Sequence, residues 1–160
     1  VSSEALSYNL SEYLQFDPFR TFAPGRIFRR ELFKIFGGIT QGCPTEDSVI
    51  VLRALMLGSI QRLPINVISY RRTESSVSVP KNLKKLNIQP IIDQYRKDVE
   101  TAYEKGLINT NKRAKLLQRI TVDSMRRVLI NWSHANWVMN YICRILIKLL
   151  ESGYRFSLKF

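Results

Sequence analysis

Residues on which enzyme chemistry often depends are scarce in this chain of 160 residues. The two cysteines, Cys43 and Cys143, are far apart and have no partners at metal-ligand spacing, which favours a reducing compartment. We therefore expect a cytoplasmic protein. His134 is the single histidine, and because it lies between two tryptophans on an expected helix, we expect it to pack rather than to serve a Ser-His-Asp triad. A glycine-rich phosphate loop, a histidine cluster and internal repeats are all absent.

Hydrophobic runs are too short or too interrupted for a membrane span, which needs roughly 20 apolar residues. The N-terminal sequence has no basic start followed by an apolar run, so it does not resemble a signal peptide. The chain begins with Val1 rather than Met, so we interpret it as an excised piece. Its length fits one ordinary domain, or a half-domain with an extension.

Positive charge is abundant, and it is concentrated in the second half. Residues 1–80 contain nine Lys and Arg against seven Asp and Glu, whereas residues 81–160 contain sixteen against six. The net charge is therefore +2 in the first half and +10 in the second. A basic surface of this kind attracts nucleic acid or an anionic membrane.

Hydrophobic periodicity predicts an α/β first half and an all-helical second half, so the chain as a whole is expected to be mainly helical. We expect a helix over 3–16, a short strand-like run after Pro24-Gly25, and a short helix that ends at Gly37-Gly38. We also expect a helix from Thr45 to Gly58, strands over 59–64 and 65–72, a helix that ends at Gly106, and two helices within 111–151 that divide near 131–137.

Arg53 is the one polar residue between Val49 and Leu57. The helix that carries it is therefore expected to be buried on nearly all sides. A cation in that position needs a partner or a route to solvent.

The segments "FAPGRIFRRELFKIFGG" and "PTEDSVIVLRALMLGSIQRLPINVISYRRTESSVS" together resemble the C-terminal part of the catalytic domain of family 2 glycosyltransferases, which have the GT-A fold. The similarity covers roughly residues 20–78. It lies in the order and spacing of several short pieces: "RRELF", "TED", "LRAL", a glycine before a strand, and "YR" before a serine-containing turn.

The resemblance implies that Asp47 is the general base of an inverting sugar transfer, in which one carboxylate accepts the proton of the attacking hydroxyl. Glu46 and Thr45 would support the acceptor pocket. The competing interpretation is an ordinary helix start, because Thr caps helices and acidic residues are favoured in the first turn.

Arg71 and Arg72 could bind the diphosphate of the donor, since guanidinium groups bind phosphate through two hydrogen bonds. Alternatively, they mark the end of a strand that meets solvent. Where the family often has a metal-binding histidine after "YR", this chain has Arg72-Thr73, so we expect no metal ligand here.

An Asp-x-Asp motif, which in the resembled family holds the divalent metal on the donor diphosphate, is absent from the sequence. The resemblance thus implies that residues 1–80 are the acceptor-side half of the catalytic domain and that residues 81–160 are a basic helical extension. Mg²⁺ or Mn²⁺ would act in the complete enzyme, but this chain alone would neither bind it nor catalyse. The expected partners are a nucleotide-sugar donor and a glycan or glycolipid acceptor.

The basic extension contains Trp132, Trp137, Tyr141 and Tyr154, which could lie at the boundary between water and lipid and hold the protein at the inner face of a membrane. The same aromatic residues could instead form core or a homodimer interface. A non-catalytic oligomerisation module and a nucleic-acid-binding module are further alternatives. We do not expect a nucleic acid partner, because the basic residues form no recognisable nucleic-acid-binding motif. The basic residues on which the nucleic-acid alternative rests are Lys81, Lys84, Lys85, Lys112, Arg113, Lys115, Arg126 and Arg127.

Overall fold

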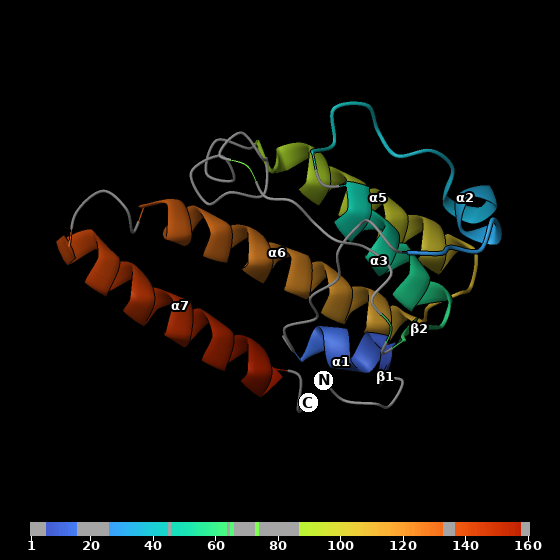
Figure 1. The fold of residues 1–160 in the computed structure, drawn as a ribbon. Helices are drawn as coiled ribbons and strands as arrows, with labels where there is room; N and C mark the ends of the chain where they lie inside the picture. The colour runs from blue at the N-terminus through green and yellow to red at the C-terminus, as the bar shows by residue number, and fades with distance from the viewer. Residues whose placement is uncertain are drawn as a thin grey trace. The chain divides into compact units, whose positions relative to one another are not determined.

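The structure is a computed structural model that describes residues 6–15, 26–44, 46–63, 65, 73, 87–132 and 137–157. The chain divides into two compact units, Val1–Ile108 and Asn109–Phe160. The described residues are mainly helical and contain one small two-stranded sheet (Figure 1). The expectation of a mainly helical chain is confirmed. The expected division at residue 80, between the acceptor-side half and the basic extension, stays a prediction.

The sheet of the first unit joins two segments that are far apart in the sequence. Strand β1 (Leu6–Asn9) pairs antiparallel with β2 (Ser59–Arg62), and Tyr8 lies opposite Ile60. The helix expected over 3–16 is therefore wrong for residues 6–9, and among the described residues 6–15 the helix is α1 (Leu10–Leu14).

Asn9 explains why helix α1 begins so late. Its side chain accepts hydrogen bonds from the backbone amides of Ser11 (2.8 Å) and Glu12 (3.2 Å), while the Glu12 carboxylate accepts one from the Asn9 amide at 2.7 Å. This reciprocal arrangement is a capping box, which defines a helix N-terminus. The residues before it are left extended and pair with β2.

Three further helices form the rest of the described part of this unit: α2 (Glu31–Phe36), α3 (Glu46–Leu57) and α5 (Gln89–Glu104). Helix α3 packs against α2, α5 and β2. The expected ends of α2, α3 and α5 at Gly37, Gly58 and Gly106 are confirmed. The strand-like run expected after Pro24-Gly25 is wrong for residues 26–29, which have no regular secondary structure.

The core of the first unit lies between these helices, and α3 contributes most to it. Its apolar residues are buried on several sides, as the sequence predicted. Helix α5 contributes one apolar face, and α2 contributes two side chains. The most buried apolar residues of these three helices are Leu32, Phe36, Val49, Leu52, Leu55, Met56, Ile91, Val99 and Ala102.

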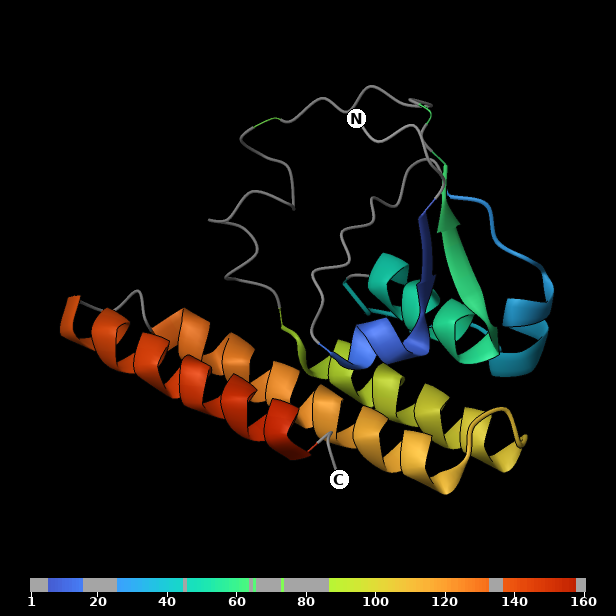
Figure 2. The ribbon, with the colours of Figure 1, turned by 90° about the horizontal axis from the view of Figure 1, so that it is seen from below.

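The second unit is a pair of long helices, α6 (Thr110–Trp132) and α7 (Trp137–Ser157). They run side by side in opposite directions (Figures 1 and 2). Arg126 Nε of α6 lies 3.0 Å from Glu151 Oε1 of α7. The predicted division into two helices is confirmed. In the described part of the chain, no helix has both the length and the apolar character that a membrane span requires.

Candidate functional site

Asp47 and Glu46 occupy the first turn of α3, as the family resemblance expects. Glu46 is exposed, and the Asp47 side chain is 33% exposed. Thr45, the expected cap, lies outside the described residues, and so do Arg71 and Arg72. Of the predicted site residues, the structure therefore locates the two acidic ones.

Arg26 contacts Asp47 at two points. Its Nη1 atom donates a hydrogen bond to the backbone carbonyl oxygen of Asp47 at 2.8 Å, and its Nη2 atom lies 3.6 Å from the carboxylate oxygen Oδ2. Because a guanidinium group is planar and rigid, contacts with both the backbone and the side chain restrict how Asp47 can turn.

The other carboxylate oxygen of Asp47 is oriented by its own helix. Oδ1 accepts a hydrogen bond from the backbone amide of Ser48 at 3.0 Å. The first turn of a helix carries partial positive charge, which stabilises an anion there. One-third of the side chain remains exposed, so a hydroxyl group can still approach the carboxylate.

Two opposing effects act on the pKa of the Arg26 guanidinium. Its side chain is only 11% exposed, and burial lowers the pKa of the guanidinium, while the nearby Asp47 carboxylate raises it. The loss of solvation is the larger effect. Because an arginine starts from a very high pKa, it stays protonated at neutral pH.

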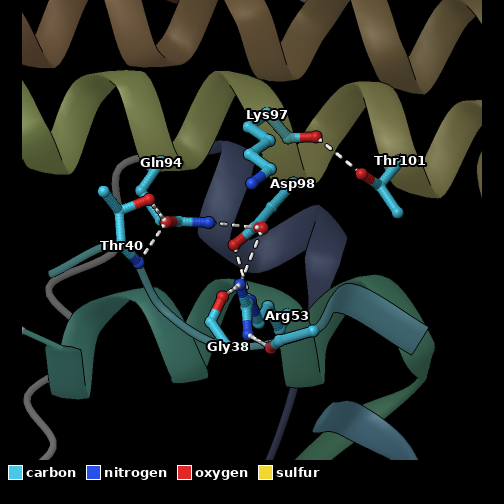
Figure 3. Close-up of polar contacts among 8 residues, drawn as sticks. Gly38, Thr40, Arg53, Gln94, Lys97, Asp98 and Thr101 are labelled. Atoms are coloured by element: carbon cyan, nitrogen blue, oxygen red, sulfur yellow. Dashed lines mark hydrogen bonds and ion pairs between the residues drawn. The ribbon is translucent and has the colours of Figure 1, made fainter. Parts of the chain in front are cut away.

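Arg53 lies deeper in α3 and is completely buried. It forms a two-point ion pair with Asp98 of α5, from Nε to Oδ2 at 2.6 Å and from Nη2 to Oδ1 at 2.9 Å (Figure 3). Gln94 Nε2 donates a third hydrogen bond to Asp98 Oδ1 at 2.8 Å. The partner that the sequence required for Arg53 is thus a carboxylate on another helix.

The same network fixes the segment that leads from α2 towards α3. Arg53 donates to the carbonyl oxygens of Gly37 (2.8 Å) and Gly38 (3.4 Å). Gln94 Oε1 accepts hydrogen bonds from the amide (2.9 Å) and the hydroxyl (2.7 Å) of Thr40 (Figure 3). Segment 37–40 is therefore tied to both α3 and α5.

The buried network supports the candidate site and does not form part of it. Arg53 comes six residues after Asp47, which corresponds to about 9 Å along a helix axis. It is too distant to contact a group that reacts at Asp47. Its role is to hold α3 and the preceding segment in place, so that the first turn of α3 has a defined position.

Among the described residues, no group of three or more His, Cys, Asp or Glu is arranged to hold a metal ion. Cys43 is half-buried and Cys143 is buried, and they form no disulfide with each other.

Comparison of the chain with models of protein families, with curated proteins and with solved structures gives no match.

Two parts of this arrangement could not be found from sequence spacing. Arg26 precedes Asp47 by 21 residues and Asp98 follows Arg53 by 45, so neither pair lies at a local helical or strand spacing. The sequence does contain a related signal: a lone arginine in an apolar helix requires a buried acceptor. That signal identifies the need for an acidic partner without saying which residue provides it.

Proposed function

We propose that this chain contains the acceptor-side half of an inverting glycosyltransferase of the GT-A type. The reaction would transfer a sugar from a nucleotide-sugar to a polysaccharide or lipid-linked acceptor. The proposal starts from the order of motifs over residues 20–78. The observation that carries it is a carboxylate, Asp47, which is held on both oxygens and yet remains one-third exposed.

In the proposed reaction, an acceptor hydroxyl attacks the anomeric carbon of the donor sugar. A new carbon–oxygen bond forms, the bond to the nucleoside diphosphate breaks, and the diphosphate leaves with the bonding electron pair. The hydroxyl proton moves to the Asp47 carboxylate, which acts as the general base. Glu46 and Thr45 would shape the acceptor pocket beside it.

Arg26 serves as a positioning residue in this proposal. Because it contacts both the backbone and the carboxylate of Asp47, it would keep the base aimed at the acceptor. A misplacement of about 1 Å in such a group can reduce a rate by roughly a hundredfold.

Donor binding is assigned to other residues. Arg71 and Arg72 would contact the diphosphate, and an Asp-x-Asp motif on a longer polypeptide would bind the Mg²⁺ or Mn²⁺ ion. The sequence contains no such motif, so we expect the 160-residue chain by itself to show no turnover.

The test is sugar transfer by the full-length polypeptide that contains these residues, measured with a panel of UDP- and GDP-sugars and a membrane extract as acceptor. We expect Asp47→Asn to reduce transfer by about a hundredfold to ten-thousandfold, the usual contribution of a general base. The control is Asp93→Asn, the same substitution at an exposed position of α5, which should leave transfer unchanged.

Each outcome decides a different part of the proposal. Transfer that is equal in the wild type and in Asp47→Asn would disprove the role of Asp47 as the base and leave the enzyme class standing. Absence of transfer by the wild type with every donor would refute the enzyme class itself.

A further inference from the structure

Helix α7 has an apolar stripe on its exposed side. Its members recur at intervals of three and four residues, the spacing of a single helix face. Each is between 42% and 67% exposed, although large apolar side chains usually lie in the interior. The stripe consists of Val138, Tyr141, Ile142, Ile145, Leu146 and Leu149.

The opposite side of α7 faces inward. Cys143 is 1% exposed and Tyr154 is 2% exposed, and helical geometry places both of them more than a third of a turn from the centre of the stripe, on the side away from the basic residues. Helix α7 therefore has two apolar faces, one of which is buried in the fold while the other is exposed. A surface helix that only completed a core would need just one.

Basic side chains flank the exposed stripe. Arg144, Lys148 and Arg155 are all exposed, and the helical period places Lys148 about a quarter of a turn, and Arg144 and Arg155 about a third of a turn, from the centre of the stripe on the same side. Residues 109–160 contain ten Lys and Arg against two Asp and Glu, a net charge of +8. The occupant of this surface must therefore cover apolar side chains and accept positive charge beside them.

We propose that the α7 stripe binds the surface of an anionic lipid bilayer, with α7 lying along the interface. Helices that bind in this way bury an apolar face at the level of the headgroups and acyl chains, while basic residues at the edge contact anionic headgroups. The stripe runs from Val138 to Leu149, a rise of about 17 Å along the helix. Because Arg144 and Lys148 interrupt the apolar surface of α7, the helix would lie on the bilayer rather than cross it.

Charge and apolar character together distinguish an anionic bilayer from two other possible occupants, a second copy of the chain and nucleic acid. A second copy of the chain could cover the stripe, but it would bring a second set of the same basic flank close to the first, and like charges in contact are unfavourable. Nucleic acid would neutralise the basic residues but would leave the apolar stripe in water. An anionic bilayer satisfies both features together.

Two of the aromatic residues singled out from the sequence, Tyr141 and Tyr154, lie on different faces of α7. Tyr141 belongs to the stripe and is 67% exposed, whereas Tyr154 is buried and cannot contact lipid. For Tyr154, the burial favours the alternative that these aromatic residues form core. Its position along α7 places it on the buried face of the helix, with Cys143. The side chains of Trp132 and Trp137 lie outside those that the structure describes.

The test is flotation of the 160-residue chain with vesicles of phosphatidylcholine alone and of phosphatidylcholine mixed with phosphatidylglycerol. We expect binding to the anionic vesicles only. Leu149→Ser removes one apolar side chain from the stripe and should weaken binding by roughly tenfold or more. Leu63→Ser is the matched control, because Leu63 is a comparably exposed leucine, at 56%, in the other unit; it should bind as the wild type does.

The charge of the flank is tested separately. The double variant Arg144→Gln, Lys148→Gln keeps the stripe and removes two charges. We expect it to lose affinity by about fivefold for each charge, and to show a weaker dependence on salt than the wild type. Circular dichroism of each variant checks that its helix content is unchanged.

Three results would overturn the proposal. Equal binding to neutral and anionic vesicles would remove the role of the basic flank. Failure to bind either vesicle, with a wild-type dimer that Leu149→Ser converts to a monomer, would assign the stripe to self-association. Failure to bind either vesicle, with duplex DNA or RNA bound instead, would assign the basic residues to nucleic acid. None of these results depends on sugar transfer. The membrane inference can therefore fail while the proposed enzyme stands, and the proposed enzyme can fail while the membrane inference stands.

Discussion

Replacing Asp98 with asparagine would test the buried network most directly. The Asp98 carboxylate accepts three hydrogen bonds, two from Arg53 and one from Gln94. Asparagine has nearly the same shape, but it has one acceptor oxygen and an amide group that donates. In either orientation the amide nitrogen faces at least one donor of Arg53, and the arginine loses its counter-charge.

The expected cost follows from the burial of Arg53, whose side chain is fully excluded from water. Removing one partner of a buried ion pair leaves an uncompensated charge and typically costs about 3 to 5 kcal/mol. For a chain of this size, each kcal/mol lowers the melting temperature by roughly 2 to 4 °C. We therefore expect Asp98→Asn to melt about 6 to 20 °C below the wild type.

Differential scanning calorimetry is the assay, with Asp93→Asn as the control. Asp93 lies on the same helix but is exposed and accepts a hydrogen bond from Gln89 at 2.8 Å, so its substitution should cost less than about 1 kcal/mol. If Asp98→Asn melted within a degree or two of this control, the buried pair would not hold α3 to α5, and the reasoning would be wrong.

Two further predictions concern other parts of the chain. Arg26→Ala in the full-length polypeptide should reduce sugar transfer by up to roughly a hundredfold. The double variant with Asp47→Asn should be no slower than Asp47→Asn alone, because both residues act through one carboxylate. Additive losses would show that Arg26 acts elsewhere. Burial raises the pKa of Tyr154 to about 12, while Arg119 lowers it and Asp123 raises it to smaller degrees. Since the unfolded chain releases this proton near pH 10 and the folded chain holds it, stability should fall as the pH rises from 10 to about 12, by roughly 1.4 kcal/mol for each unit. Denaturant unfolding at alkaline pH would check this, and a Tyr154→Phe variant that showed the same alkaline loss would contradict it.

Local signals in the sequence predicted much of the described fold. Gly37, Gly58 and Gly106 each follow a run with helical periodicity, and the three helices end at them. The strand at residues 6–9 was missed because its polar and apolar residues also suit a helix. The decisive residue was Asn9, whose capping box with Glu12 is readable in the sequence as an Asn followed by a Glu three positions later.

The candidate site was only partly predictable, for a different reason. The first turn of α3 and its two acidic residues follow from the local sequence around Glu46 and Asp47. The arginine that orients Asp47 comes from another segment, and contacts of that kind depend on how the chain folds back on itself. For the same reason, the burial of Arg53 was predictable, but its pairing with Asp98 was not.

The pairing of Arg53 with Asp98 also constrains the order in which the chain can fold as it is synthesised. Arg53 leaves the ribosome 45 residues before the carboxylate that compensates its charge. Until Asp98 emerges, a fully buried Arg53 would be an unpaired cation in an apolar environment, which is strongly unfavourable. Helix α3 therefore cannot settle into its final position ahead of α5. The first turn of α3, with Asp47, therefore takes its final position only after residues well beyond 78 have been made.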